Sequence, residues 1–223
     1  MAPHILTDDL LLLAYRPDTG RPLADATRLT CGLAGALIAD LVLADRVRLA
    51  DDRLHAGGYT HTGDPDLDDT ARRIGSEYRT RKVKWWVQKM NKTALRRRMH
   101  DRAVSDGVLV HSQGRIMGIF PSNEYRPAVP GSRESSVAWL RSVLLGYDAP
   151  DPRSVALLAL VGAVKLDGRL FSDIPGRERR KRIKAIMARD DIGRAVRAVI
   201  QSIEGAVAAA GAAGAGGDGG GGS

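Results

Sequence analysis

The chain has 223 residues, 43% hydrophobic and 27% charged, which is typical of one globular domain with a sizeable core. Its one cysteine, Cys31, excludes an internal disulfide and a zinc site built from cysteines. The net charge of +8 favours anionic partners. We expect a cytosolic protein, because we recognise no N-terminal signal and no apolar run near the roughly 18–20 residues of a membrane span.

The first third of the chain predicts helices and one small hairpin. Thr7 is expected to cap a short apolar helix that ends before Pro17. Apolar residues at spacings of three and four over 29–42 predict a buried helix, in which alanine and glycine permit close helix approach. Residues 46–58 alternate around an Ala-Asp-Asp turn, as in a hairpin. Asp64, followed by proline, predicts another helix with acids in its first turn.

Residues 82–105 are predicted to form one basic helix that stops before an Asp-Gly pair. From Arg72 to Arg102 the chain has twelve lysines and arginines against two acids, a net charge of +10. A cationic surface of this kind concentrates nucleic acid or anionic lipid headgroups. The alternative is a solvated helix face that only keeps the protein soluble.

Side chains on this helix are expected to include a cationic stripe and an indole pair. Trp85 and Trp86 point about 100 degrees apart, so at most one can face the core fully. Indole rings favour the boundary between water and lipid. The alternative is one core tryptophan beside one that half-covers a groove. On a helix, residues three or four positions apart lie on one face, which would contain Lys89, Lys92, Arg96 and, less closely, Lys82.

An apolar hairpin is predicted directly after the basic helix. Residues 108–111 and 115–120 form its strands, residues 112–114 form its turn, and the prolines at 121, 127 and 130 mark a loop. The second strand is too apolar to have one solvated face, so it packs on the core, joins another subunit or enters lipid. The side chains behind this prediction are Ile116, Met117, Ile119 and Phe120.

Four more helices are predicted in the remaining chain, at residues 134–146, 154–166, 176–189 and 192–209. The helix at 154–166 is apolar nearly all round, so we expect it to be central. Residues 1–209 are expected to form a single domain, followed by a disordered glycine-rich tail at 210–223. The predicted fold class is mainly α, a helical bundle surrounded by amphipathic helices, with a protruding apolar β-hairpin.

Nothing in the sequence supports catalysis, a metal site or a cofactor. We find no glycine-rich phosphate loop, serine elbow or Cys–His pair. His55 and His61 stand near Asp64 and Asp66, but their spacing matches no metal-ligand template and fits a turn and a helix cap. The acids at 64–69 are expected to complement the helix dipole, because nothing apolar surrounds them to shift a pKa.

Six segments, in this order and with matching spacing, resemble the Golgi phosphoprotein 3 family over roughly residues 5–205. The resemblance implies a helical bundle wrapped by amphipathic helices, with a hydrophobic hairpin that contacts lipid or another subunit. It also implies peripheral membrane binding through a basic pocket for phosphatidylinositol 4-phosphate, and tethering of membrane enzymes by their cytosolic tails. The segments are "LTDDLLLLAYRPDTG", "GLAGALIADLVLADRVRL", "DLDDTARRI", "WW…LRRRMHDRAVSDGVL", "GRIMGIF" and "DPRSVALLALVGAVKL".

The resemblance also points to candidate headgroup-binding residues. The family's site is a tryptophan and three arginines, and an ungapped alignment places these on Asp25, Ala34, Thr93 and Arg96. One of the four positions keeps its residue here, so we expect affinity for anionic lipid or phosphate in general rather than selectivity for one headgroup. With neighbouring arginines as substitutes, the candidate headgroup-binding residues are Arg96, Arg97, Arg98 and Arg28.

The leading hypothesis is a cytoplasmic, non-enzymatic protein that associates peripherally with anionic phospholipid membranes and acts as an adaptor for the tails of membrane enzymes. Its hairpin either enters lipid or forms a homo-oligomer. The alternative is a winged-helix-like nucleic-acid-binding protein, because a basic helix followed by a two-stranded hairpin also describes that fold. The apolar second strand argues against nucleic acid, since a wing over phosphates should be rich in lysine and arginine. A scaffold that only binds protein tails is a third hypothesis.

Overall fold

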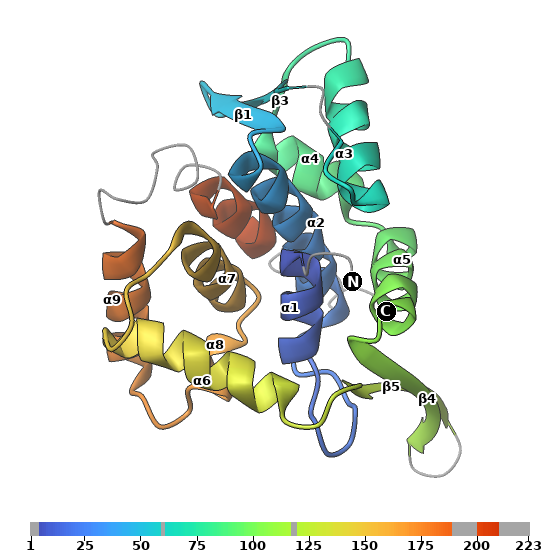
Figure 1. Cartoon of the computed structure of the whole chain (residues 1–223), viewed down its shortest axis with the longest axis vertical. Coiled ribbons are helices and arrows are strands. Elements are labelled where there is room, and N and C mark those ends of the chain that lie inside the picture. Colours follow the sequence, from blue (N-terminus) through green and yellow to red (C-terminus); the bar gives the residue numbers. More distant parts are fainter. Residues whose placement is uncertain (1–4, 59–60, 117–119, 189–199, 210–223) are drawn as a thin grey trace, which may run out of the picture.

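The computed structural model describes the chain except residues 1–4, 59–60, 117–119, 189–199 and 210–223 (Figure 1), so the predicted tail lies outside the described residues. Helix predominates, which confirms the mainly α class. The helices are α1 (Leu6–Leu13), α2 (Ala26–Leu43), α3 (Pro65–Ser76), α4 (Val83–Met90), α5 (Thr93–Ser105), α6 (Ser132–Leu145), α7 (Pro152–Ala163), α8 (Asp167–Leu170), α9 (Gly176–Met187) and a segment at 200–209. The strands are β1 (Val47–Ala50), β2 (Arg53–Ala56), β3 (Arg81–Lys82), β4 (Leu109–Ile116) and β5 (Phe120–Pro127).

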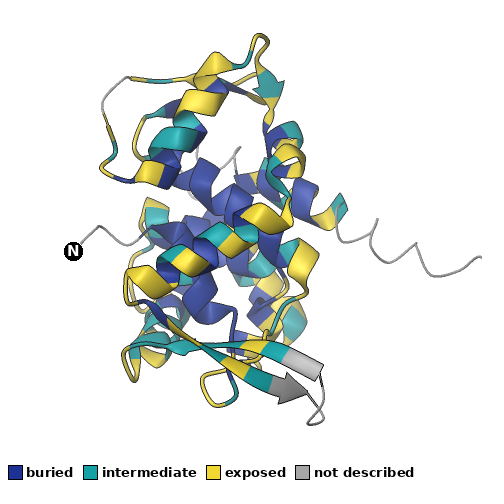
Figure 2. Ribbon diagram, turned by 90° about the vertical axis from the view of Figure 1, so that its right-hand side faces the viewer, coloured by how far each residue is buried: buried dark blue, intermediate teal, exposed yellow. Residues whose placement is uncertain are grey.

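Helix α2 is the centre of the fold, and Figure 2 shows the buried residues gathered in the middle of the molecule. Every residue at 29–42 is buried, and α1, α3, α4, α5 and α7 pack against this helix. Its glycines permit the close approach that was predicted. A Cβ at Gly32 would stand 2.5 Å from a methyl of Val164, and one at Gly35 would stand 2.4 Å from a methyl of Ile203.

Helix α2 also corrects the prediction that no apolar run approaches the length of a membrane span. Within the described residues, α2 is long and apolar enough to cross a bilayer by length and composition. Arg28 and Asp40 interrupt this run near its two ends, which makes it look shorter in the sequence than the helix is. Because 78% of the helix is buried inside the fold, this composition is also that of an ordinary core helix.

Asp40 is a carboxylate buried between α2 and α1. Its Oδ2 accepts a hydrogen bond of 2.8 Å from the N–H of Leu6, and its Oδ1 lies 3.7 Å from Nη1 of Arg153. Burial raises the pKa of Asp40 to about 7, while the Leu6 N–H and Arg153 act in the opposite direction. A raised folded-state pKa stabilises the fold fully below the ordinary value of 3.8, and this stabilisation is lost as the pH rises through about 7.

Replacing Asp40 with asparagine is therefore expected to stabilise the protein at alkaline pH. Asparagine keeps an acceptor for the Leu6 N–H and removes the buried charge. The cost of burying the amide is the same at every pH, so we expect the free energy of unfolding of the variant, relative to that of the wild type, to rise by about 4 kcal/mol from pH 4 to pH 8. Denaturant titrations at both pH values measure this, and an equal loss of stability at both would contradict it.

The start of α1 differs from the prediction. The helix begins at Leu6, so Thr7 lies buried inside its first turn and is not the N-cap. The carboxylate of Asp8 instead accepts a hydrogen bond of 3.3 Å from the N–H of Ile5, the residue that precedes the helix. An acid in the first turn thus takes the capping role that a threonine hydroxyl was expected to have.

The small hairpin predicted at 46–58 is confirmed, because β1 and β2 pair antiparallel around Asp51 and Asp52. Both aspartates have positive φ angles, of 50° and 60°, a conformation that aspartate tolerates better than most residues. Strand β3 pairs with β2 and completes a three-stranded sheet. This strand was not predicted, since two residues show no periodicity.

The basic helix predicted over 82–105 is two helices, α4 and α5, so that prediction is wrong. The break lies at Asn91 and Lys92, where Lys92 is extended, with φ −129° and ψ 144°. Asparagine favours helix ends because its side chain competes with the helical backbone hydrogen bonds. The break also invalidates the predicted stripe, because Lys82 and Lys89 precede it, Lys92 lies in it and Arg96 follows it.

The second hairpin is longer than predicted and turns further along the chain. Residues 112–114, the predicted turn, lie inside β4, and Pro121 and Pro127 lie inside β5 rather than in a loop. Proline is tolerated there because both strands of a two-stranded hairpin are edges. The hairpin leaves α5 at one end of the molecule (Figures 1 and 2). The backbones of Ile116 and Phe120 pair with each other. The side chains of these two residues, and all of Met117 and Ile119, lie outside the described part of the chain.

Candidate anion-binding surface

A buried ion-pair network around Arg102 joins α5 to α3 and to α1. Nη2 of Arg102 lies 2.5 Å from Oδ2 of Asp64 and 3.6 Å from Oδ2 of Asp8. Its Nη1 lies 3.6 Å from Oδ2 of Asp66, and its Nε lies 3.1 Å from Oδ2 of Asp106. The Arg102 side chain is only 11% exposed, so this arginine holds the fold together and is not available to a ligand.

The acids at 64–69 therefore have more than the predicted role. Asp64 does cap α3, because its Oδ1 accepts two hydrogen bonds of 2.9 Å from backbone N–H groups of the first turn. However, burial raises the pKa of Asp66, so the prediction that nothing shifts a pKa in this segment is wrong. Asp68 shifts the other way: hydrogen bonding from the backbone N–H of Thr62 lowers its pKa to about 2.

Ion pairs neutralise much of the basic segment. Arg98, a predicted headgroup residue, places its Nε 2.8 Å from Oδ1 of Asp66. Most of the acids that neutralise these cations lie outside residues 72–102, in the turn between β1 and β2 and at the start of α3. The net charge of +10 counted over residues 72–102 therefore overstates the charge of this surface. The paired cations of the segment are Arg72, Arg73, Arg81, Lys82, Lys89, Arg98 and Arg102.

The two tryptophans differ in burial, which confirms that at most one of them faces the core fully. Trp86 is 2% exposed and belongs to the core, whereas Trp85 is half-buried. Cations cover the Trp85 ring, with the Arg81 guanidinium 4.8 Å and the Lys89 Nζ 4.4 Å from its centroid. Cation–π contact of this kind accounts for the position of Trp85 beside two basic side chains.

A cavity of about 350 Å³ opens between α3, α4 and α5, beside the break at Lys92. Its apolar lining comes from Trp86, Met90 and Leu95. Its charged lining has one acid, Glu77, against four cations, namely Arg73, Lys89, Lys92 and Arg98. Since three of these cations pair with acids, Lys92 brings the uncompensated charge to this cavity.

The N-terminal end of α5 concentrates cations that have no acid beside them. Lys92 is the N-cap and makes no side-chain cap bond, and the first turn contains no acid. Arg96 and Arg97 follow one turn later, and Arg97 is exposed. Within the described residues, none of these three cations has an ion-pair partner. The positive end of a helix dipole favours anions, so the arrangement is unfavourable until an anion binds.

The fourth predicted headgroup residue, Arg28, lies apart from this cluster. It is in the first turn of α2, where its Nε is 3.4 Å from Oδ2 of Asp25, the N-cap of that helix. Although α2 packs against α5, no hydrogen bond or ion pair within the described residues joins Arg28 to the α5 arginines. Arg98 and Arg28 are thus engaged by aspartates, whereas Arg96 and Arg97 have no ion-pair partner within the described residues.

An aromatic cluster that the sequence analysis missed fixes the hairpin against α5. The Nδ1–H of His100 donates to the carbonyl of Arg96 at 2.6 Å, so its Nε2 accepts the 2.5 Å hydrogen bond from the Tyr15 hydroxyl. Tyr125 of β5 packs on both rings and stacks on His111 of β4. Burial lowers the pKa of His100, which keeps the ring neutral. No local motif connects these residues, because they come from four separate elements.

The loop between α1 and α2 also holds the base of the hairpin. The N–H of Tyr125 donates to the carbonyl of Gly20 at 2.9 Å, and Nε of Arg126 donates to the carbonyl of Asp18 at 3.2 Å. Gly20 has a φ of 66°, and a Cβ there would stand 2.9 Å from the Tyr125 nitrogen. Only glycine fits this approach, so the loop and the hairpin form one packed unit.

These features define a mainly helical protein with an apolar central helix and a hairpin that follows the C-terminal end of α5, the helix whose other end is basic. The family model of Golgi phosphoprotein 3 (GPP34) matches residues 6–203, and the chain therefore belongs to that family. This confirms the resemblance found in the sequence. No curated protein matches the chain.

Proposed function

We propose that this protein binds peripherally to membranes through anionic phospholipid headgroups, at the N-terminal end of α5. The observation behind the proposal is that Lys92, Arg96 and Arg97, at and just after the start of α5, have no ion-pair partner within the described residues, and that the first turn of this helix contains no acid. Membership of the Golgi phosphoprotein 3 family supports it. Phosphate oxygens match both the forked donors of arginine and the free N–H groups of a helix start.

The positions aligned with the family's headgroup residues favour general anion binding over phosphatidylinositol 4-phosphate selectivity. Ala34 is fully buried in α2, and Asp25 is an acid that caps the same helix. Thr93 begins α5 without a charge, and Arg96 remains. An acid where the family has a tryptophan repels a phosphate and offers no ring. The proposal therefore names anionic lipids as a class.

The proposed role is that of an adaptor and not of an enzyme, at the cytoplasmic surface of a membrane. The hairpin belongs to this proposal as the element that enters lipid or joins a second subunit, and cytosolic tails of membrane enzymes are the proposed clients. Each lysine or arginine near an anionic surface contributes about 1 kcal/mol. Three such residues give reversible binding, which an adaptor requires.

Reversing the charge of Arg96 and Arg97 together, as Arg96→Glu and Arg97→Glu, is expected to weaken binding to phosphatidylserine-containing vesicles by about thirtyfold. Co-sedimentation with vesicles of phosphatidylcholine, with and without phosphatidylserine, measures this. The matched control is Arg177→Glu with Lys181→Glu, which makes the same charge change on exposed positions of α9. That control is expected to retain most of the binding.

Two further arms of this experiment separate the rival functions. Vesicles with phosphatidylinositol 4-phosphate at matched charge should bind no better than those with phosphatidylserine, and a large preference would contradict general anion binding. A duplex DNA shift assay at the same salt concentration tests the nucleic-acid alternative. Binding to DNA without binding to acidic vesicles would overturn the proposal.

A further inference from the structure

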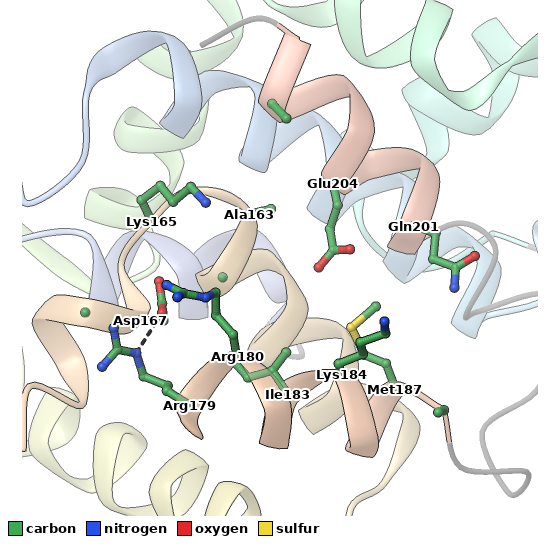
Figure 3. Close-up of a pocket in the computed structure, with 14 residues that line it drawn as sticks. Ala163, Lys165, Asp167, Arg179, Arg180, Ile183, Lys184, Met187, Gln201 and Glu204 are labelled. Atoms are coloured by element: carbon green, nitrogen blue, oxygen red, sulfur yellow. Dashed lines mark hydrogen bonds and ion pairs between the residues drawn. The ribbon is translucent and has the colours of Figure 1, made fainter. Parts of the chain in front are cut away.

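A second, larger cavity lies on the other side of the molecule from α5, between α7, α8, α9 and the helical segment at 200–209. Its volume is about 750 Å³, within the range of roughly 300–1,000 Å³ that small-molecule sites have. Figure 3 shows the side chains that line it, with those of Lys165 and Glu204 directed toward the central space. None of these residues belongs to the surface proposed for membrane binding.

The charges that line this cavity are unbalanced. Arg179 and Asp167 form an ion pair of 2.7 Å between Nε and Oδ2, and they neutralise each other. Within the described residues, no ion pair neutralises the three remaining cations, Lys165, Arg180 and Lys184. Among the described lining residues, Glu204 is the other acid, so these residues carry a net charge of +2 when it is ionised.

Apart from Gln201, the remaining described residues of the lining have apolar side chains or are glycines. Ile183 and Met187 project from α9, Ala163 ends α7 and Ala208 lies on the last helical segment. Ile183 and Met187 are buried although they line the cavity. A phosphate alone would meet the cations and leave this apolar lining unused, whereas a neutral apolar molecule would leave the cations unused. An amphipathic anion matches both kinds of lining.

We propose that this cavity binds a single-chain anionic amphiphile, an alkyl phosphate, with its head between Lys165, Arg180 and Lys184 and its chain on Ile183 and Met187. The guanidinium of Arg180 supplies two parallel donors for phosphate oxygens, and the lysines supply charge. Glu204 opposes the binding of an anion. Burial raises the pKa of Glu204, which reduces this opposition as the acid takes up a proton.

Isothermal titration of the full chain with decyl phosphate, below its critical micelle concentration, tests the proposal. We expect one molecule bound per chain, and the variant Arg180→Gln/Lys184→Gln to weaken binding by about tenfold. The control variant Arg177→Gln/Lys181→Gln removes two cations from the same helix, at exposed positions outside the cavity. The control variant should bind decyl phosphate as tightly as the wild type does. An equal loss of affinity in the two variants would show that only the net charge of the protein matters, and would overturn the proposal.

The variant Glu204→Gln gives a test of opposite sign. Removal of the opposing carboxylate should strengthen decyl phosphate binding by about threefold. 1-Decanol and inorganic phosphate are the probes that separate the two halves of the ligand, and each should bind far more weakly than decyl phosphate. If decanol bound as tightly as decyl phosphate, the cavity would be a purely apolar site. If inorganic phosphate bound as tightly, it would be a simple anion site. Either result would overturn the proposal. Arg96→Glu/Arg97→Glu should leave binding unchanged, so this result is independent of the vesicle result.

Discussion

Replacing Arg102 with methionine is expected to lower the free energy of unfolding by about 3 kcal/mol, or to prevent folding. The methionine fills a similar volume but leaves Asp64 and Asp66 without the cation that compensates them. Removing one partner of a buried ion pair typically costs about 3–5 kcal/mol, because the remaining charge stays desolvated. Arg102 is 11% exposed, which places the expected loss at the lower end. Chemical denaturation at neutral pH measures it.

A double variant distinguishes this cause from a loss of packing. Asp64→Asn added to Arg102→Met removes a buried charge and keeps a side chain that caps α3 as well as aspartate does. The double variant should therefore be more stable than Arg102→Met alone. If instead the two losses add, the network does not stabilise the fold through charge compensation. Arg97→Met, on the exposed side of the same helix, should change the free energy of unfolding little.

Replacing Arg179 with methionine is expected to have an effect of similar size at the other end of the molecule. Its Nε donates to Asp167, and its Nη1 donates to the carbonyls of Phe171 at 3.1 Å and Ile174 at 2.6 Å. The residue is 9% exposed and Asp167 is 8% exposed. The variant leaves a carboxylate and two carbonyls without this donor, so we expect a loss of about 3 kcal/mol.

Lysine at the same position should recover part of this loss. Its ammonium group restores an ion pair with Asp167 but cannot reach three acceptors with the fixed fork of a guanidinium. Thermal or denaturant unfolding should therefore order the proteins as wild type, Arg179→Lys and Arg179→Met. Arg177→Met, an exposed neighbour on α9, serves as the control. A lysine variant as unstable as the methionine variant would show that the carbonyl contacts dominate.

The elements that the sequence predicted well are those with strong local signals. Helical spacing identified α2, the Asp-Pro pair identified the start of α3, and the Ala-Asp-Asp turn placed β1 and β2. The family resemblance was equally accessible, because ordered segments over most of the chain support it and the family model matches 6–203. These signals depend on neighbours within a few residues, which a sequence shows directly.

The errors arose where contacts between distant parts of the chain decide the local structure. The turn of the second hairpin was misplaced because a Gly-containing triplet at 112–114 resembles a turn, while docking of Tyr125 on Gly20 and His100 extends the strands past it. The candidate site was overestimated for the same reason. Arg98 and Arg102 are engaged by acids some 30 residues earlier, and no spacing rule connects them.

The neutralisation of the basic segment by α3 also limits what fragments of this protein report. A synthetic peptide that spans α4 and α5 lacks the aspartates of α3, so Arg98 and Arg102 become free cations in it. Such a peptide adheres to any polyanion more strongly than the intact domain does, since electrostatic attraction grows with the number of uncompensated charges. Affinities mapped on excised pieces of this region therefore describe the pieces, and the folded domain has a smaller, more localised cationic surface.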